Sequence, residues 1–331
     1  MSKVTVMGSG SWGTAMALTL CDNDHEVTLW ARRPEVCAAI NGEHRNPDYF
    51  PELVLPDRLT AEADPQRALV DADFVVLAVP AQSLRENLRD WQFGADAIVV
   101  SLAKGVELGT GLRMSEVIME VTDVTPGRIA VLTGPNLSHE IAARQPAAAV
   151  VASAEQQTAL AVQQLFHTAT FRPYTNNDVL GCELGGATKN VIALAVGVAA
   201  GMGYGANSAA SLITRGLAEI IRLGEAMGAD PHTFSGLAGI GDLMATCSSP
   251  LSRNRTFGEE LGRGRTVAEI AGSTRQVAEG VKSCKSIRAL AVKYGVEMPI
   301  TEAVCSVIDG TLAPDALVQA LLARAAKPER Y

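Results

Sequence analysis

Residues 3–17, KVTVMGSGSWGTAMA, decide the fold, because a short apolar run leads into closely spaced glycines and then into helix-forming residues. Val4 and Val6 suit a strand. Gly8 then allows a tight turn, Gly10 lets the backbone approach a pyrophosphate, and Gly13 lets the next helix pack closely. The first N–H groups of that helix would point at the anion. A purely structural glycine turn is the alternative, but the position between a strand and an apolar helix favours nucleotide binding.

The length and composition of the chain indicate a globular protein with two domains. Its 331 residues exceed the size at which a single core usually stops growing. The chain is 47% hydrophobic and 19% charged, which is typical of a folded protein. The net charge of -8 argues against non-specific binding to nucleic acid or to an anionic membrane, although a local cationic pocket could still receive a phosphate.

The cysteines indicate a reducing compartment. Six are present, at positions 21, 37, 182, 247, 284 and 305, and no two form a CxxC pair. A chain of this size does not need disulfides, so we expect a cytoplasmic location and no metal site. The N-terminal residues enter a strand without a basic region or an apolar signal core, and no uninterrupted apolar run reaches membrane length. We therefore expect a soluble protein without membrane insertion.

The second predicted strand, residues 26–30 (EVTLW), carries the choice of cofactor at its end. A strand, a helix and another strand in succession are typical of a parallel sheet. An NAD site often has an acidic residue here for the ribose 2′-hydroxyl, whereas this chain has Arg32 and Arg33. Arginines would accept a 2′-phosphate, so the pattern favours NADP(H) over NAD(H). Two solvated arginines before a helix that opens at Pro34 are the alternative.

The remaining N-terminal pattern predicts an α/β fold. Residues 41–59 contain three prolines and predict a long connection. Further strands are predicted over 73–79, 97–102, 128–132, 147–152 and 170–174, with helices over 82–88, 111–120 and 155–166. This alternation predicts a Rossmann-like domain built on a mostly parallel sheet.

From residue 177 onward the pattern changes to long helices rich in small residues. They are predicted over 183–200, 207–227, 253–262, 279–294, 299–308 and 312–325. We place the domain boundary between 176 and 186. Residues 1–180 then form the dinucleotide-binding domain, and residues 181–331 form an all-α substrate and catalytic domain.

Polar residues follow two of the predicted strands. Lys104 comes just after residues 97–102, and Gly134 and Asn136 come just after residues 128–132. Ligands of open α/β sheets bind beyond the carboxyl ends of the strands, so these residues are candidates for ligand contact. An exposed loop lysine and a plain Gly-Pro-Asn turn are the alternatives.

Lys189 is the residue we expect to carry the chemistry. It stands within a Gly- and Ala-rich apolar helix, where a charge is costly unless it faces a partner or a ligand. Helical side chains lean toward the N-terminus, so Lys189 should cover Gly185 and Gly186, where missing side chains would leave room for a substrate. Partial desolvation would lower its pKa toward neutrality, which suits proton transfer. A lysine that snorkels to the helix surface is the alternative.

Residues 239–255 form a polar segment between two helical regions. Ser252 can cap the helix that starts at 253, while Arg253 and Asn254 offer donors to phosphate oxygens at its N-terminus. Asp242 can pair with Lys189 and orient its ammonium group, or it can simply cap the next turn. The segment resembles a clamp for the phosphate end of a small substrate.

Six segments together resemble the bacterial-type NAD(P)-dependent glycerol-3-phosphate dehydrogenases over nearly the whole chain. In order they are GSGSWGTAMA, SLAKG, LTGPN, GATKNVIALAVG, GDLMATCSSPLSRNRTFG and VAEGV. The resemblance implies reversible reduction of dihydroxyacetone phosphate to sn-glycerol 3-phosphate in the interdomain cleft. The product of that reaction supplies glycerophospholipid synthesis.

The resemblance also implies two sets of contacts. Besides the glycine turn, the dinucleotide would be contacted by Ser11, Trp12, Arg32, Arg33, Lys104, Ser138, Arg253, Val277 and Glu279. The substrate would be contacted by Lys104, Gly134, Asn136, Lys189, Asp242, Ser252, Arg253 and Asn254, with Lys189 transferring the proton. Many relatives have Ser or Thr in place of Asn136 and Ala in place of Ser138, and both departures still offer polar or small contacts.

Two other functions remain open. A β-hydroxyacid or 6-phosphogluconate-type dehydrogenase shares the glycine turn, the helical second domain and a GxxxK helix, which residues 185–189 satisfy. In that group an Asn usually follows the Lys by three or four residues, whereas here Asn190 is adjacent. A non-catalytic dinucleotide sensor would have little need for Lys189 and Asp242. The apolar, Gly-rich helices of the second domain are compatible with a homodimer.

Overall fold

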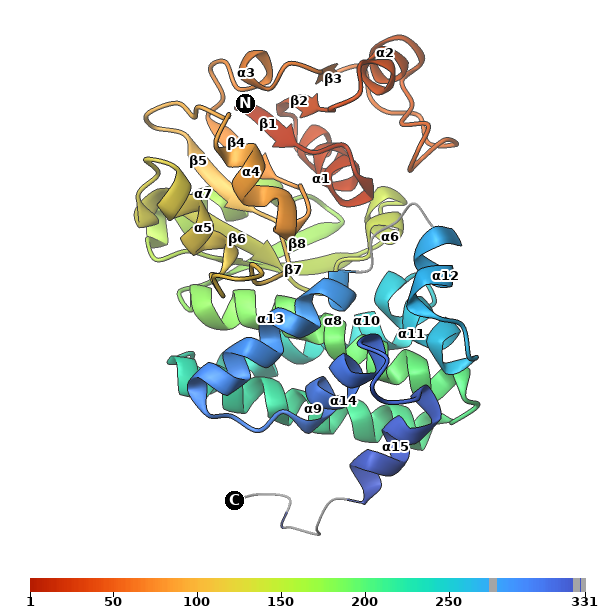
Figure 1. Ribbon diagram of the computed structural model, residues 1–331. Coiled ribbons are helices and arrows are strands. Elements are labelled where there is room, and N and C mark those ends of the chain that lie inside the picture. The colour runs from red at the N-terminus through yellow and green to blue at the C-terminus, as the bar shows by residue number, and fades with distance from the viewer. Residues whose placement is uncertain (274–278, 324–327, 329–331) are drawn as a thin grey trace.

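The computed structural model describes residues 1–273, 279–323 and 328. A sheet with its covering helices forms the N-terminal half, and a cluster of helices forms the C-terminal half below it (Figure 1). This architecture confirms the α/β class, with a Rossmann-like first domain and a helical second one. The last strand ends at Asn176 and the next helix begins at Val179. The division at residues 180 and 181 stays a prediction.

Eight strands form one sheet in the order β3-β2-β1-β4-β5-β6-β7-β8. They are β1 (Lys3–Met7), β2 (Glu26–Trp30), β3 (Leu59–Glu62), β4 (Phe74–Leu77), β5 (Ile98–Ser101), β6 (Ile129–Thr133), β7 (Ala147–Ala152) and β8 (Phe171–Asn176). All neighbours are parallel except β6 and β7, which are antiparallel. The strand order reverses between β1 and β4, and such a switch point is where open α/β sheets bind ligands.

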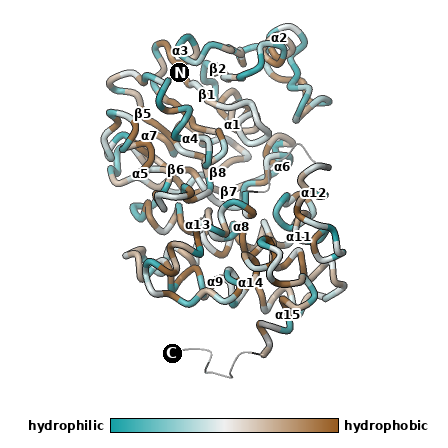
Figure 2. Tube along the Cα trace, viewed as in Figure 1, coloured by the Kyte–Doolittle hydropathy of each residue, from teal (hydrophilic) through white to brown (hydrophobic). Residues whose placement is uncertain are grey.

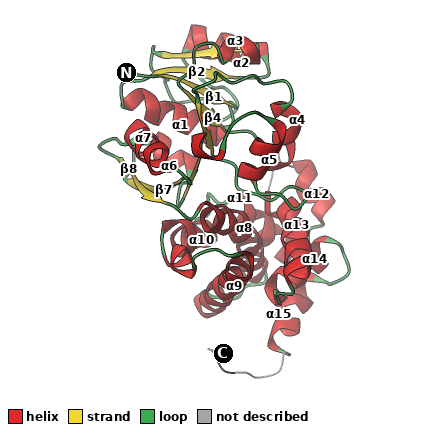
Figure 3. Cartoon of the chain, turned by 90° about the vertical axis from the view of Figure 1, so that its left-hand side faces the viewer, coloured by secondary structure: helices red, strands yellow, loops and turns green. Residues whose placement is uncertain are grey.

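Helices cover both faces of the sheet (Figure 3). One face carries α1 (Ser11–Asp22), α6 (Ser138–Ala142) and α7 (Gln156–Phe166), and the other carries α4 (Leu84–Leu88) and α5 (Met114–Val121). Successive strand residues point to opposite faces, so each face has its own apolar core. The short helices α2 (Pro34–Glu43) and α3 (Pro65–Ala68) and the 3₁₀ turns η1 (Ala81–Ser83) and η2 (Pro126–Arg128) complete this half.

The C-terminal half is built from helices in its described residues. They are α8 (Val179–Gly201), α9 (Ala206–Met227), η3 (Pro231–Ser235), η4 (Leu237–Gly241), α10 (Asp242–Ser248), α11 (Arg253–Gly262), α12 (Val267–Ser273), α13 (Glu279–Tyr294), α14 (Pro299–Ile308) and α15 (Pro314–Leu322). Hydrophobic stretches gather inside both halves, and hydrophilic ones lie toward the periphery, as around α2 (Figure 2).

Helix α8 is the centre of the C-terminal half. Helices α9, α10, α11, α13 and α14 all pack against it, and residues 181–199 are buried. Within the described residues it is the one helix long and apolar enough to cross a membrane, yet 89% of its apolar window lies inside the structure. Its hydrophobicity is therefore explained by its place in the core.

Glycines bring α8 and α11 into backbone contact. A Cβ at Gly197 or Gly201 would overlap the backbone of α11, and a Cβ at Gly258 or Gly262 would overlap the backbone of α8. Because no side chains separate the two helices, the first turn of α11 is held beside the middle of α8.

Several short elements differ from the prediction. The connection predicted over residues 41–59 is largely irregular, but it ends in the edge strand β3, which the sequence analysis missed. Helices α6, α10 and α12 were also missed. Each is at most seven residues long, so its apolar residues cannot establish a period.

Candidate functional site

The glycine turn after β1 is tightly packed on one side and open on the other. Gly8 has a φ of 131°, and a Cβ there would lie 2.8 Å from the carbonyl oxygen of Ala78 at the end of β4. A Cβ at Gly13 would overlap the carbonyl oxygen of Gly8. These contacts confirm the tight turn and the close helix packing. Nothing lies within 4 Å of the position that a Cβ of Gly10 would take.

The surroundings of this turn fit a phosphate group. Ser11 and Trp12 begin α1, and Gly10, which has no side chain, is its N-cap. The first N–H groups of the helix therefore have no side-chain cap, and an anion is favoured beside such groups. Asn46 steadies the loop, because its Nδ2 donates to the carbonyl oxygen of Ser9 at 2.9 Å. That a pyrophosphate approaches the backbone at Gly10 stays a prediction.

Arg32 and Arg33 follow β2 but differ in their contacts. Both are exposed, but Arg33 forms ion pairs with Asp48 and Glu35, whereas Arg32 forms no ion pair with a described residue. Asp48 and Glu35 already offset part of the positive charge of Arg33. Arg32 is therefore the better candidate for a 2′-phosphate, and the preference for NADP(H) stays a prediction.

Lys189 is buried in α8, and its ammonium group has two partners on α10. Its Nζ lies 2.5 Å from Oδ1 of Asp242 and 2.6 Å from Oγ1 of Thr246. The predicted pairing of Lys189 with Asp242 is confirmed. The alternative of a lysine that snorkels to the surface is wrong, because only 9% of the side chain is exposed.

Lys104 comes from the other half of the molecule and meets the same carboxylate. Its Nζ donates to Oδ2 of Asp242 at 2.7 Å and to the carbonyl oxygen of Gly134 at 3.0 Å. The alternative of an exposed loop lysine is therefore wrong. Two ammonium groups share one carboxylate, so the cluster of Lys104, Lys189 and Asp242 carries a net positive charge that suits an anionic or strongly polarised ligand.

The environment of Lys189 moves its pKa toward neutrality, as predicted. The pKa of Lys189 is lowered to about 8, chiefly by burial; the charge of Asp242 raises this pKa, and the charge of Lys104 lowers it. The balance leaves a group that can both give and take a proton near neutral pH.

The two glycines one turn before Lys189 are closely packed. A Cβ at Gly185 would overlap the carbonyl oxygen of Ala238, and a Cβ at Gly186 would lie 3.0 Å from Oγ1 of Thr133. The expectation that these glycines leave room for a substrate is wrong, because η4 and β6 pack into that space. They instead let α8 lie close to the sheet.

The loop after β6 holds three more predicted contact residues. Gly134 has a φ of 130°, and its carbonyl oxygen binds Lys104. The Nδ2 of Asn136 donates to the carbonyl oxygen of Ala148 at 3.0 Å, while its buried Oδ1 has no hydrogen-bond partner in the described structure. A buried acceptor without a donor is costly, which makes this oxygen a candidate for a ligand hydroxyl. Ser138 begins α6, and its contact with the dinucleotide stays a prediction.

The predicted phosphate clamp gathers at the start of α11. Ser252 caps the helix as predicted, with its Oγ accepting a backbone N–H of the first turn at 3.3 Å. The Nδ2 of Asn254 donates to Oδ1 of Asn190 at 2.8 Å, and its Oδ1 accepts the N–H of Gly280 at 2.9 Å. Arg253 stands beside them and is exposed. Phosphate binding by these residues stays a prediction.

Glu279 opens α13 close to this clamp. Burial raises the pKa of Glu279, while the charge of Arg253 and the backbone N–H of Ala81 lower it. Two of the predicted cofactor contacts, Arg253 and Glu279, therefore lie in one electrostatic neighbourhood. Val277, another predicted cofactor contact, lies outside the described residues.

Two residues of this site carried no prediction. Thr246 binds Lys189, and Asn190 fixes the amide of Asn254. Thr246 stands four residues after Asp242, so its place on the same helical face was available from spacing alone once α10 was known. Asn190 gave no local signal, since its partner lies on another helix.

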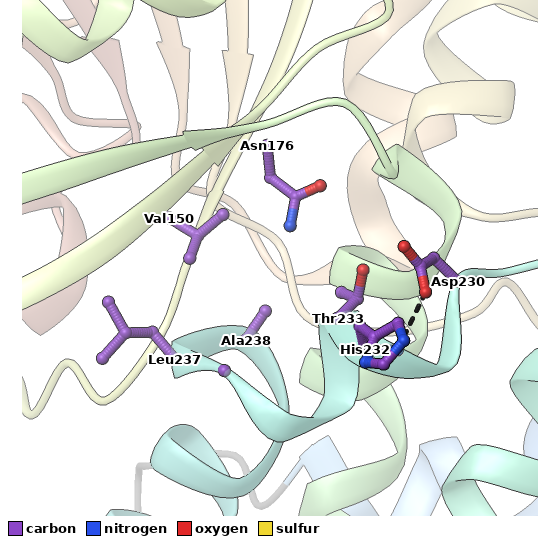
Figure 4. Close-up of a pocket in the computed structure, with 8 residues that line it drawn as sticks. Val150, Asn176, Asp230, His232, Thr233, Leu237 and Ala238 are labelled. Atoms are coloured by element: carbon purple, nitrogen blue, oxygen red, sulfur yellow. Dashed lines mark hydrogen bonds between the residues drawn. The ribbon is translucent and has the colours of Figure 1, made fainter.

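A shallow pocket of about 190 Å³ lies elsewhere on the junction of the two halves (Figure 4). Val150 and Asn176 border it from the sheet, and Asp230, Thr233 and Leu237 border it from the helices. The pocket contains none of the predicted site residues, so the polar cluster around Asp242 remains the candidate site.

Two family models match the chain. The NAD-dependent glycerol-3-phosphate dehydrogenase N-terminus matches residues 3–159, and the NAD-dependent glycerol-3-phosphate dehydrogenase C-terminus matches residues 178–319. Together they cover most of the sequence.

Named relatives and solved structures agree with these matches. Glycerol-3-phosphate dehydrogenase (NAD(P)+) of Thermobifida fusca is 60% identical over 334 residues, covering 100% of this chain and 99% of the relative. The corresponding protein of Streptomyces griseus is 60% identical over 330 residues, covering 99% and 98%. The crystal structure of glycerol-3-phosphate dehydrogenase from Coxiella burnetii superposes with a TM-score of 0.93 at 35% identity, covering 98% of this chain and 99% of that one.

Proposed function

The chain belongs to the NAD-dependent glycerol-3-phosphate dehydrogenase family, and on this premise we propose that it reversibly reduces dihydroxyacetone phosphate to sn-glycerol 3-phosphate with NAD(P)H. It is an oxidoreductase, and family membership argues against both the β-hydroxyacid dehydrogenase and the non-catalytic sensor. The product would supply glycerophospholipid synthesis in the cytoplasm.

The observation that carries the mechanism is the buried cluster of Lys104, Lys189 and Asp242. The bound dinucleotide supplies the hydride. Lys189 polarises the ketone oxygen and gives it a proton as negative charge develops there. Asp242 keeps the ammonium of Lys189 in place, and Lys104 adds a second positive charge at the developing alkoxide.

The remaining residues hold the substrate in the reactive orientation. Arg253 and the N-terminus of α11 bind the phosphate, and Asn254 offers its second amide hydrogen. Oδ1 of Asn136 accepts a hydrogen bond from the substrate hydroxyl. Binding of the substrate at both ends would orient its carbonyl carbon for hydride transfer, which is the positional part of the catalysis.

The test of the function is a direct assay on the purified full chain. Dihydroxyacetone phosphate should cause loss of NADPH absorbance, and sn-glycerol 3-phosphate with NADP+ should restore it. A 3-hydroxyacid or 6-phosphogluconate should give no comparable oxidation rate. Absence of turnover with dihydroxyacetone phosphate under either NADPH or NADH would refute the proposal.

Lys189→Ala tests the proton-transfer role. We expect kcat to fall by about 10³-fold, since general acid catalysis contributes on that order. The dissociation constant of NADPH, followed by nucleotide fluorescence, should stay within about two-fold because the glycine turn is untouched. Lys293→Ala, an exposed lysine of α13, is the matched control and should keep full activity. Full activity in the Lys189 variant would contradict the assignment.

We also propose a homodimer and a preference for NADP(H). The preference rests on the exposed guanidinium of Arg32. Light scattering on the eluted protein measures the oligomeric state, and a mass equal to the single chain at all concentrations would exclude the dimer.

A further inference from the structure

Glu183 is a buried carboxylate on α8 that reaches across to the N-terminal half. Its Oε1 accepts the backbone N–H of Ser115 at 2.8 Å. Its Oε2 accepts Oγ of Ser115 and Nη1 of Arg113, both at 2.6 Å. Arg113 is the N-cap of α5, and Ser115 lies in its first turn. A carboxylate of the catalytic helix therefore caps a helix that belongs to the sheet.

This contact is an ion pair shielded from water. The side chain of Glu183 is 3% exposed and that of Arg113 is 14% exposed. All three groups that face the carboxylate are donors, as an ionised carboxylate requires. Removing Arg113 would leave the buried carboxylate of Glu183 without its positive partner, whereas Arg113 would still pair with Glu116 if Glu183 were removed, so the contact favours one arrangement of the two helices.

The loop that follows β5 is fastened to the C-terminal half at both ends. At its start Lys104 binds Asp242, and at its end Arg113 binds Glu183. Between them, Val106 is 1% exposed and packs in the apolar core of the C-terminal half. This loop of the sheet domain therefore connects Lys104, at its start, with Arg113, which binds α8 at its end.

We propose that Glu183 is a positioning residue for the reaction, which clamps α8 to the start of α5 through Arg113 and Ser115 and so holds Lys189 in register with Lys104. This inference rests on the proposed function. Glu183 does not touch the reacting atoms and acts through α8. The dinucleotide-binding turn is on one half and the proton donor is on the other, so a shift of α8 by about 1 Å is expected to lower the rate on the order of 10²-fold.

Glu219 provides a matched control for a substitution at Glu183. It is also a buried carboxylate that caps a helix, accepting the N–H of Ile300 at 2.6 Å and the N–H of Thr301 at 3.2 Å. Its partners lie at the start of α14, within the C-terminal half. Glu183→Gln and Glu219→Gln therefore make the same chemical change, but only the first affects a contact between the halves.

The experiment compares the two variants with the unchanged chain. Glu183→Gln should lower kcat for dihydroxyacetone phosphate by about ten-fold or more, while the dissociation constant of NADPH stays within about two-fold. Glu219→Gln should lower thermal stability and keep kcat within about two-fold. Equal kcat values in the two variants would overturn the inference. An inactive unchanged chain would instead overturn the proposed function.

Ser115→Ala keeps the test decisive if Glu183→Gln does not fold. It removes one hydrogen bond to Oε2 and leaves the ion pair with Arg113 intact. We expect a folded protein, checked by circular dichroism, whose kcat is lowered about three-fold with an unchanged KM for NADPH. Folded Ser115→Ala with the kcat of the unchanged chain would overturn the inference.

Discussion

Asp242 determines the electrostatics of the site at the scale of single residues. Each of its carboxylate oxygens accepts a different ammonium group, Oδ1 that of Lys189 and Oδ2 that of Lys104. The carboxylate is 1% exposed, so water does little to screen these charges. The pKa of Lys189 is therefore set by its burial, by this carboxylate and by the charge of Lys104.

The two directions of the reaction should depend oppositely on pH. Reduction needs protonated Lys189, and the pKa of Lys189 is lowered from its ordinary value to about 8, so kcat for reduction should fall as pH rises through about 8. Oxidation needs the neutral amine, so its kcat should rise through the same range. Initial rates across a pH series in both directions check this, and parallel profiles would contradict it.

Asp242→Asn should move the same transition to lower pH. Asp242 raises the pKa of Lys189, so its loss leaves burial and Lys104 to lower that pKa further. The other titratable groups in the field of Lys189 are Cys247, which burial holds neutral by raising its pKa to about 12, and Glu279. The pH profile of reduction measures the shift, and a transition that moves upward would be the wrong sign.

Arg32→Ala should separate the two cofactors. Both arginines are exposed beyond β2, but Arg33 is paired with Asp48, whereas Arg32 has no ion pair with a described residue. Loss of a charge-assisted contact to the 2′-phosphate should raise KM for NADPH by about ten-fold and leave KM for NADH unchanged. Arg58→Ala, at an exposed pair with Asp24, is the control. Equal effects on both cofactors would mean that Arg32 does not read the 2′-phosphate.

At the scale of elements, the backbone contact of α8 with α11 positions the residues of the proposed phosphate clamp. Asn254 meets Asn190 at the start of this contact, and Gly258 meets Leu194 one turn further along. The two helices therefore run side by side in one direction, and their glycines set the distance from Lys189 to Arg253.

Gly258→Ala should disturb both stability and substrate binding. Its Cβ would overlap the carbonyl oxygen of Leu194, and overpacking of this kind costs about 1 to 3 kcal/mol. Moving α11 should also raise KM for dihydroxyacetone phosphate more than KM for NADPH. Gly42→Ala in α2 is the matched control, because nothing lies within 4 Å of its Cβ position. Urea unfolding measures the stability of the two variants, and steady-state kinetics measures their KM values. A Gly258→Ala variant with effects as small as those of Gly42→Ala would contradict the close contact.

Elements marked by local sequence signals were predictable from the chain, and elements that depend on distant contacts were not. The strand at residues 26–30 and the helix at residues 253–262 agree with the structure to the residue, because apolar periodicity and the Ser252 cap are local signals. The edge strand β3 and the helix α10 depend on neighbours. β3 exists because it pairs with β2, and α10 because Asp242 and Thr246 face Lys189.

For the whole molecule, Val106 joins the two halves through a shared core. It follows the sheet strand β5 yet packs with the apolar residues of α8 and α13. Val106→Ala should lower the free energy of unfolding by about 1 to 3 kcal/mol, since it leaves a cavity in a core that spans both halves. Val70→Ala, at a side chain that is 65% exposed, should change it by less than about 0.5 kcal/mol. Denaturant unfolding of the two variants tests whether Val106 belongs to a core that both halves share.

The assembled site shows where prediction from the chain ends. Lys189, Asp242 and Arg253 could be predicted as site residues because charged residues in apolar or Gly-rich surroundings are unusual. That Lys104 and Lys189 share one carboxylate could not be foreseen, since these three residues lie on separate elements of the two halves. The glycines before Lys189 were misjudged for the same reason, because η4 fills the space beside them.

The burial of α8 has a consequence for synthesis of the chain. The helices that cover it, α9, α10, α11, α13 and α14, all follow it in sequence. A ribosome therefore releases an apolar helix of membrane length well before its covering helices exist, and during that interval exposed hydrophobic surface favours aggregation. The sheet domain can fold early, whereas α8 is not fully covered until nearly the last residues have been added.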